Sequence, residues 1–367
     1  MTDPRIEYLF VTPAPLVSVD GQVTTFGASA RLGSLAPARA LMRLGYDART
    51  FSTAGDEMPA TRAAAGAKRV VLGEMFPTEG GLAGTAAIYR RVLAAVREPR
   101  ERVVFSIADD HFDDPPFRDF YAEALPECLG VTTVSEGLAA TLRTFTSRPV
   151  RIAPEPSEGE RGTPQAFLPR KPPGPLAWLA RRIGLPNDLW RVRLLWFGYP
   201  ANLPPLIELL PGLEALARRH PLLLTLVTSP IAELNALLTP ERTRESSPMR
   251  IHFLPWHPLV MPSVIASNDI VLIPSAYRDP VKQAKSPNRL VAGLHGGRFV
   301  VAHPLPAYAP YAAYSWIGED LCEGVRWAIE HPREVVERIA RGQEYVDQKH
   351  SAEAVARFWL DVLDAKN

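Results

Sequence analysis

A chain of 367 residues is longer than a single hydrophobic core usually supports, so we expect two domains. Its hydrophobic content of 46% is that of a folded globular protein, and a formal net charge of +1 gives no overall attraction to nucleic acid. No apolar run approaches the ~20 residues of a membrane span, and the N-terminus lacks the apolar region of a signal peptide. These features predict a cytoplasmic protein.

The first half of the chain alternates strand and helix patterns. Apolar runs predict strands at 6–11, 47–51, 69–72, 102–107, 128–134 and 150–153. Helical spacing follows most of them, at 35–44, 83–96, 117–125 and 136–145. Ser34 is placed to cap the first helix, and Gly45 is placed to end it. Strand–helix–strand units predict right-handed crossovers and a parallel sheet, so we assign 1–154 to a first doubly wound domain.

A change of composition follows. Eight prolines fall between Pro154 and Pro186, and no strand pattern interrupts them. We therefore expect a Pro-rich linker at 155–190. Within it, 176–183 is a short amphipathic piece that could lie on a membrane surface or pack against its own domain.

The second half repeats the alternation. Strands are predicted at 191–197, 222–227, 250–254, 270–273 and 299–301, with helices at 206–216, 231–238, 259–266 and 290–294. Helical segments at 319–330, 333–345 and 352–363 close the chain. These patterns predict a second Rossmann-like domain at 191–345 and a C-terminal helix within 346–367 that can pack back on the first domain.

A polar, basic loop follows the predicted strand at 270–273. It carries Lys282, Lys285, Ser286, Asn288 and Arg289 just before a short helix. Ligands of parallel α/β sheets bind beyond the carboxyl ends of the strands, and the N–H groups at a helix start favour anions. The loop therefore indicates a phosphate-bearing ligand, although a solvated surface loop has the same composition.

Two doubly wound domains joined by a linker predict a cleft between facing sheet edges. The strand ends of the first domain supply an Arg-Gly-Ser loop and an acidic cluster, and those of the second supply glycine, amide, hydroxyl and basic groups. A carboxylate or His111 on one wall could take a proton from an attacking hydroxyl, while the basic wall holds phosphates.

Short motifs in the second half resemble the nucleotide-sugar domain of GT-B glycosyltransferases, especially glycosyltransferase family 4. They are LLWFG followed by Asn202, then LTLVTS, IHFLPW, DIVLIPS and KSPNRLVAGLHGGRFVVA. In the first half, RLGSLAPARALMRLGYDARTFS and GVTTVSEGLAATLR are similar to parts of the acceptor domain. The resemblance implies transfer of a sugar from a nucleotide sugar to a glycan or lipid-linked acceptor, with a retaining outcome and no metal or other cofactor.

The resemblance also implies roles for individual residues. Lys285 and Arg289 would bind the donor diphosphate, Ser286 and Asn288 the phosphate or ribose, and Trp256 would border the base unless it only packs in the core. The full set of residues is donor-binding Gly198, Asn202, Thr228, Trp256, Ser275, Lys282, Lys285, Ser286, Asn288 and Arg289, acceptor-binding Arg31, Gly33 and Ser34, and catalytic Asp109, Asp110 and His111.

One departure from the family pattern leaves alternatives open. Common family 4 members carry two glutamates eight residues apart in this loop and helix, whereas Ala284 and Ala292 stand at the matching positions here. The KSPNR loop therefore indicates a divergent branch. An inactive relative that binds a nucleotide sugar or a partner protein is one alternative, and a sugar-nucleotide epimerase is another. Surface polysaccharide or lipopolysaccharide assembly, in the cytoplasm or at the inner face of the membrane, is the setting that the resemblance implies.

Overall fold

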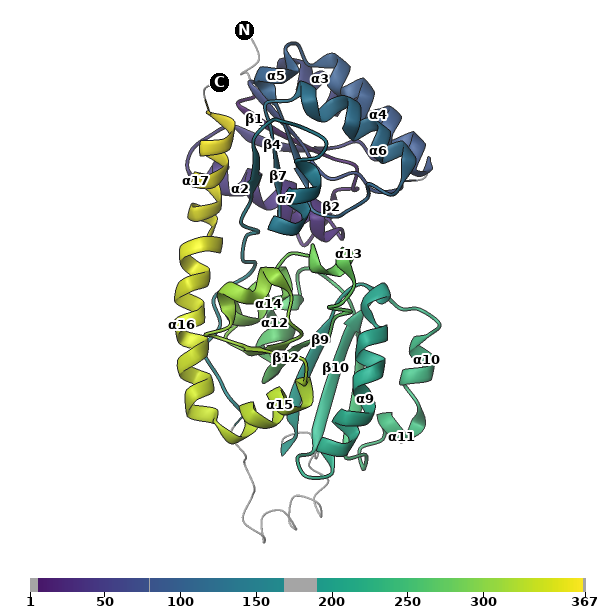
Figure 1. The fold of residues 1–367 in the computed structure, drawn as a ribbon, viewed down its shortest axis with the longest axis vertical. Helices are drawn as coiled ribbons and strands as arrows, with labels where there is room; N and C mark the ends of the chain where they lie inside the picture. Colours follow the sequence, from purple (N-terminus) through teal and green to yellow (C-terminus); the bar gives the residue numbers. More distant parts are fainter. Residues whose placement is uncertain (1–5, 79, 168–189, 366–367) are drawn as a thin grey trace. The chain divides into compact units, whose positions relative to one another are not determined.

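The computed structural model describes residues 6–78, 80–167 and 190–365. The chain divides into two compact units, each built on a parallel sheet with helices on both faces (Figure 1). The first unit comprises Met1–Ser157, Gln283–Ser286 and Asp347–Asn367, and the second comprises Glu158–Lys282 and Pro287–Val346. The amphipathic piece at 176–183, and most of the linker assigned to 155–190, lie outside the described residues.

The sheet of the first unit has its described strands in the order β4-β1-β5-β6-β7-β8, and all neighbours are parallel. The strands are β1 (Tyr8–Thr12), β4 (Ala48–Ser52), β5 (Arg69–Leu72), β6 (Val103–Ile107), β7 (Gly130–Thr133) and β8 (Val150–Ile152). The central strands are mostly apolar and almost entirely buried because helices cover both faces of the sheet. The direction in which strands are added to the sheet reverses between β1 and β5. In such sheets, ligands bind beyond the carboxyl ends of the strands at this switch point.

The first helical stretch differs from the prediction. It begins at Ala28, passes through a π-helical turn η1 (Arg31–Leu35) and continues as α2 (Ala36–Arg43). Ser34 is therefore inside the helix and buried, and it does not cap it. Pro37 is the second residue of α2, directly after the π-helical turn, and the helical run continues through it. The remaining helical segments of this part of the unit are α3 (Met58–Gly66), α4 (Gly81–Ala95), α5 (Pro99–Arg102), α6 (Pro115–Ala124), η2 (Leu125–Glu127) and α7 (Glu136–Leu142).

A short hairpin was not predicted from the sequence. Strands β2 (Val17–Val19) and β3 (Gln22–Thr24) pair antiparallel across Asp20 and Gly21. Both turn residues have positive φ, 50° and 75°, which is the backbone that a two-residue hairpin of this kind requires. The strands are only three residues long, so their pattern is too short to recognise in the sequence.

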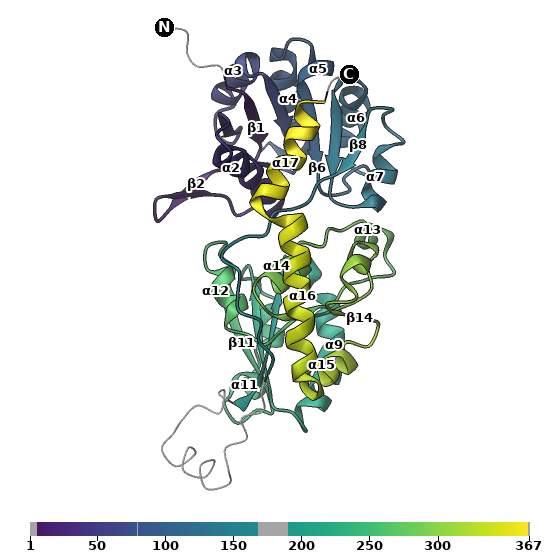
Figure 2. The ribbon, with the colours of Figure 1, turned by 90° about the vertical axis from the view of Figure 1, so that its left-hand side faces the viewer.

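The last helices close the chain. Helix α16 (Pro332–His350) is followed by α17 (Ala352–Leu363), and Ser351 caps α17 by accepting a hydrogen bond from the N–H of Ala354. Helix α17 packs against α2 on one face of the first sheet (Figure 2). Its Trp359 is buried with its ring edge-on to Phe10, at a centroid distance of 5.2 Å. The C-terminal helix therefore belongs to the hydrophobic core of the first unit.

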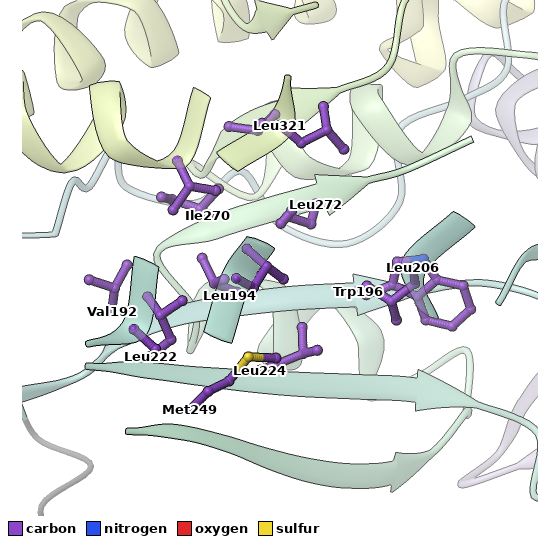
Figure 3. Close-up of a cluster of buried hydrophobic side chains, with 14 of the residues drawn as sticks. Val192, Leu194, Trp196, Leu206, Leu222, Leu224, Met249, Ile270, Leu272 and Leu321 are labelled. Atoms are coloured by element: carbon purple, nitrogen blue, oxygen red, sulfur yellow. The ribbon is translucent and has the colours of Figure 1, made fainter. Parts of the chain in front are cut away.

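The sheet of the second unit has the order β11-β10-β9-β12-β13-β14 among its described strands, again all parallel. Its strands are β9 (Val192–Phe197), β10 (Leu222–Thr228), β11 (Met249–Pro255), β12 (Ile270–Ile273), β13 (Phe299–Ala302) and β14 (Trp316–Ile317). Numbered along the chain this is 3-2-1-4-5-6, the order of dinucleotide-binding Rossmann sheets, with its reversal between β9 and β12. Figure 3 shows the apolar side chains of these strands meeting those of the covering helices, including Trp196 and Leu206.

The helices of the second unit largely follow the predicted positions. They are η4 (Pro200–Asn202), α9 (Pro204–Ala217), α10 (Leu234–Leu237), α11 (Pro240–Thr243), α12 (Met261–Ala266), α13 (Pro280–Gln283), α14 (Asn288–His295), η5 (Pro306–Tyr311) and α15 (Leu321–Glu330). The helix predicted at 231–238 is reduced to the four residues of α10. Thr239 precedes Pro240 and is extended, with ψ of 154°, because a residue before proline is disfavoured in the helical region. None of the described helices combines the length and the apolar character that crossing a membrane requires.

Candidate functional site

The switch point of the second sheet gathers basic and polar side chains from two loops. The loop after β9 runs into η4 and carries Asn202, and the loop after β12 leads through α13 to α14. The ammonium group of Lys282 donates a hydrogen bond of 3.0 Å to the side-chain oxygen of Asn202. The structure thus brings together two residues, 80 positions apart, that the sequence assigned to the donor site.

Arg289 lies over the backbone at the end of β9. One guanidinium nitrogen is 3.4 Å from the carbonyl oxygen of Phe197, which accepts its hydrogen bond. A Cβ placed on Gly198 would lie 3.4 Å from the same nitrogen, so the guanidinium is in contact with this glycine. Helix α14 begins at Asn288, and the cap residue Pro287 offers no side-chain acceptor to the first turn. A guanidinium, an exposed strand end and a helix N-terminus are the elements with which α/β sheets hold phosphates.

Three further predicted donor residues lie along this edge. Thr228 at the end of β10 is fully buried, and its hydroxyl has no hydrogen-bond partner among the described residues. The N–H of Trp256 donates to the carbonyl oxygen of Thr228 at 3.0 Å, and the Trp256 ring packs at the border of a hydrophobic cluster. After β12, the backbone of Ser275 is held by His303, whose Nδ1 lies 3.0 Å from the Ser275 nitrogen and 2.8 Å from its oxygen. The core-packing interpretation of Trp256 therefore describes at least part of its surroundings.

In the first unit, the π-helical turn η1 carries the three residues predicted to bind an acceptor. Gly33 faces β6, since a Cβ there would lie 3.4 Å from the hydroxyl oxygen of Ser106. The Ser34 side chain is buried against Gly73. A Cβ placed on Gly73 would lie 2.7 Å from the Ser34 hydroxyl oxygen. Single π-turns within helices are frequent at functional sites because they shift side chains out of helical register. Ser34 thus lies beside Gly73, the residue after β5, and Gly33 lies beside Ser106 near the end of β6, whereas Arg31 begins the turn.

The acidic segment after β6 makes specific contacts within the first unit. The carboxylate of Asp109 forms an ion pair with the ammonium group of Lys285, in a stretch that belongs to this unit. Asp110 accepts a hydrogen bond of 3.2 Å from the N–H of Phe112. The two ring nitrogens of His111 face carboxylates, with Nδ1 3.7 Å from Asp114 Oδ2. The side chains of Asp109 and His111 are partly exposed to solvent.

The stretch that carries Lys285 is anchored by backbone contacts. Ser135, the cap of α7, donates its hydroxyl to the carbonyl oxygen of Ala284 at 2.5 Å, while its own oxygen accepts from the N–H of Leu138. A Cβ on Gly137 would lie 3.4 Å from the Cα of Ala284. Ala284 therefore contributes a backbone carbonyl to this contact.

Glu74 is a site residue that the sequence reasoning missed. It follows Gly73 directly after β5, and only 3% of its side chain is exposed. Its Oε1 accepts from the N–H of Asp109 at 2.8 Å, its Oε2 accepts from the N–H of Ala108 at 3.1 Å, and His111 Nε2 lies 3.5 Å from Oε1. Burial raises the pKa of this carboxyl well above its ordinary value, and the charge of Asp109 adds to the rise. An isolated glutamate directly after an apolar strand, in RVVLGEMF, was the available signal.

Glu74, Asp109 and His111 could also be considered as metal ligands. One ligand atom from each lies within 4.8 Å of the others. Both Glu74 oxygens, however, already accept backbone N–H groups, and the Asp109 carboxylate is paired with an ammonium group. A cation there would have to share these oxygens with the donors that already bind them, which favours a hydrogen-bonded cluster over a metal site.

No protein-family model matches the chain, and no curated protein matches it in sequence. Solved structures do match. Anabaena Alr3699/HepE in complex with UDP-glucose superposes with a TM-score of 0.64 at 14% identity, covering 98% of this chain and 99% of that one. An alpha-glucosyltransferase in complex with UDP-glucose and DNA containing an abasic site has a TM-score of 0.64 at 9% identity, with 98% and 99% covered. A glycosyltransferase from Rickettsia africae ESF-5 has a TM-score of 0.60 at 11% identity, with 99% and 100% covered.

At such identities the likeness establishes the fold. The chain has two Rossmann-like α/β domains of the kind found in GT-B glycosyltransferases, which confirms the predicted fold class. The match extends over nearly the whole chain and over nearly the whole of these structures, so both units take part in it.

Proposed function

We propose that this protein is a glycosyltransferase that moves a sugar from a nucleotide-sugar donor to a hydroxyl group of its acceptor. The observation that carries the proposal is the placing of Arg289 against Gly198, at the switch point between β9 and β12 of the second sheet. This is where Rossmann sheets bind nucleotides. HepE and the alpha-glucosyltransferase share the fold and hold UDP-glucose, which supports a donor of the same class.

The second unit supplies the donor site in this proposal. Arg289 and Lys282 bind the diphosphate and offset the charge that develops on the leaving nucleotide. Gly198 lets the phosphates approach the backbone, and the first turn of α14 contributes N–H groups. The remaining donor contacts of this unit come from a set of polar and aromatic side chains, which are Asn202, Thr228, Trp256, Ser275 and Asn288. Lys285 and Ser286, which the motif resemblance also assigns to the donor, lie in the stretch Gln283–Ser286 of the first unit. No metal is required, because the positive charge is supplied by side chains.

The first unit supplies the acceptor and catalytic groups. In the reaction, the bond between the anomeric carbon and the diphosphate oxygen breaks, and the acceptor oxygen bonds to that carbon. The hydroxyl proton passes to one of Asp109, Asp110 or His111, or to the departing phosphate if configuration is retained. Arg31 and the turn that contains Gly33 and Ser34 position the acceptor.

The motif resemblance alone extends the proposal to the biological setting. It favours a retaining reaction and a glycan or lipid-linked acceptor, in surface polysaccharide or lipopolysaccharide assembly. The reaction would take place in the cytoplasm, with peripheral membrane contact as an option for a lipid-linked acceptor. Nucleic acid is not among the expected partners, because the net charge of +1 provides no overall attraction to phosphate backbones.

Donor binding is the first experiment. Wild-type protein, Arg289→Ala and the control Arg219→Ala are titrated with UDP-, GDP- and ADP-linked sugars while thermal unfolding is followed. Arg219 is exposed just beyond the end of α9 in the same unit, so its removal matches the loss of charge without touching the switch point. A true donor at a hundredfold excess over its dissociation constant stabilises the wild type and the control by about 2.7 kcal/mol. Arg289→Ala should lose most of that stabilisation.

Arg289 is a cleaner target than Lys285, because removing Lys285 also leaves Asp109 without its ion-pair partner. If no nucleotide sugar stabilises the wild type, the donor-site proposal is wrong. If Arg289→Ala is stabilised as much as the wild type, the nucleotide binds elsewhere.

An inactive GT-B relative is the second candidate. It is favoured by the alanines at 284 and 292, which leave the chain without the glutamate side chains that hold the donor in family 4 members. Such a protein would bind the nucleotide sugar without consuming it. Release of free nucleotide from a stabilising donor, measured with and without added acceptors, separates the two: turnover identifies the transferase, and tight binding without turnover identifies the inactive relative.

A further inference from the structure

Glu74 lies where three strands of the first sheet end side by side. The backbone N–H of Gly73 donates to the carbonyl oxygen of Val11 at 2.8 Å, which ties the end of β5 to β1. Gly73 has no space for a side chain, since a Cβ would lie 2.9 Å from that same oxygen and 2.7 Å from the Ser34 hydroxyl. The backbone that carries Glu74 is therefore fixed at the switch point between β1 and β5.

The Glu74 side chain reaches the loop after β6. Each carboxylate oxygen accepts one backbone N–H, from Ala108 and from Asp109, at 3.1 Å and 2.8 Å. These two amides are consecutive in the chain, so the Glu74 carboxylate binds the backbone of the loop at one place, Ala108–Asp109. Two backbone N–H bonds to one buried carboxyl group fix the loop in place, because breaking either would leave a buried polar group unsatisfied.

The same loop carries the groups to which the proposed function gives catalytic roles. Asp109 is one of the two residues whose backbone N–H binds Glu74. His111 follows two positions later, and its Nε2 lies 3.5 Å from Glu74 Oε1. The His111 ring is also held edge-on against Phe117, with centroids 5.9 Å apart. The position of both side chains therefore depends on where the Glu74 carboxylate holds the loop.

We propose that Glu74 is a positioning residue, a buried clamp that holds the segment from Ala108 to His111 so that Asp109 and His111 present their side chains to the acceptor. Glu74 is too buried to touch a substrate, so it acts through these neighbours. The inference rests on the proposed function for the catalytic part of the claim. The clamp itself rests only on the hydrogen bonds.

The test compares wild type, Glu74→Gln and the control Glu123→Gln. Glutamine keeps the size of the side chain but has one acceptor oxygen, and its NH2 group faces one of the two backbone N–H donors. Glu123 is 68% exposed on α6 of the same unit, so its substitution removes a surface charge and an exposed ion pair with Arg90. For each protein we would measure kcat, donor affinity, thermal stability and the amide hydrogen exchange of Ala108 and Asp109.

We expect kcat of Glu74→Gln to fall by about 10- to 100-fold, because small displacements of reacting groups are costly. Donor affinity should stay within about twofold, since the donor contacts proposed for Arg289 and Lys282 are made elsewhere. The Ala108 and Asp109 amides should exchange faster while amides in the sheet core do not. Glu123→Gln should match the wild type in all four measurements.

Three results would overturn the inference. If kcat and the amide hydrogen exchange of Ala108 and Asp109 are unchanged in Glu74→Gln, Glu74 does not position the loop. Parallel loss of kcat, donor affinity and thermal stability would show a general structural role. Loss of wild-type activity on chelation, restored by Mn²⁺ in the wild type but not in Glu74→Gln, would make the cluster a metal site. If the wild type neither binds nor consumes any donor, the proposed function fails instead, and the exchange measurement still decides whether the clamp exists.

Discussion

The ion pair between Asp269 and Arg193 provides a test of how the second sheet is stabilised. Asp269 immediately precedes β12, and only 2% of its side chain is exposed. It accepts hydrogen bonds from the backbone N–H of Arg193 at 2.8 Å and from two guanidinium nitrogens at 3.1 Å and 2.7 Å. The pair joins the start of β9 to the residue that precedes β12, and the carboxyl ends of these two strands form the candidate donor site.

Replacing Asp269 with asparagine removes the charge and one acceptor without changing the volume. Breaking one side of a fully buried pair costs about 3–5 kcal/mol, because the remaining charge is left without compensation. Arg193 is 35% exposed, so water can take over part of its hydrogen bonding. We therefore expect Asp269→Asn to lower the free energy of unfolding of the second unit by about 2–4 kcal/mol.

Urea unfolding followed by tryptophan fluorescence measures this change, since Trp196 lies in the core of the second unit. With a slope of about 2–3 kcal/mol per molar urea, the midpoint should fall by about 1 M. The control is Glu323→Gln, which breaks an exposed pair with Arg326 and should cost less than about 1 kcal/mol. Equal midpoints for Asp269→Asn and Glu323→Gln would refute the reasoning that burial makes the first pair important.

Three further outcomes are expected. Gly198→Ala should leave the unliganded stability nearly unchanged, because the new Cβ only reaches contact distance, but it should weaken nucleotide-sugar binding by about tenfold or more in calorimetric titration. Trp359→Ala should destabilise the first unit by about 3–5 kcal/mol in urea unfolding, because it empties the space beside Phe10. Burial lowers the pKa of His350, whose Nδ1 donates to the Glu155 carbonyl oxygen at 2.6 Å, so folding keeps it neutral. Stability should then decrease as pH falls below the unfolded value of about 6.5, and His350→Gln should flatten the dependence of melting temperature on pH between about 7.5 and 5.5.

Much of the fold could be predicted because its strands are apolar on both faces. Runs such as those of β12 and β13 are short, continuous and bounded by turn residues, which is typical of buried parallel strands. The strand order could not be read in the same way. It depends on which strands pair, and pairing joins residues far apart in the chain, such as Ile270 with Leu194. The start of the first helix was missed because a π-turn satisfies the backbone where a cap was expected at Ser34.

In the candidate site, too, features set by the local sequence could be predicted, and contacts between distant residues could not. The basic residues of the loop after β12 were identifiable because polar groups at a strand end and a helix start suggest a ligand. Their partners were not identifiable, since Lys282 binds Asn202 and Lys285 binds Asp109 over long sequence separations. Glu74 was overlooked because a single glutamate in a sequence is usually a surface residue, and only the folded chain shows that it is buried.

Two glycines at strand ends, one in each unit, have different reasons to be glycine. At Gly73, a Cβ would lie 2.7 Å and 2.9 Å from neighbouring oxygens, so the packing of the protein itself excludes any side chain. At Gly198, the nearest atom to a Cβ would be 3.4 Å away, an ordinary contact, and its φ is not positive. The fold therefore does not require glycine at 198. A glycine that neither packing nor backbone conformation requires, placed beside a guanidinium at a switch point, is best explained by close approach of a ligand. This difference supports the proposed roles of Gly73 in holding Glu74 in place and of Gly198 in the proposed donor site.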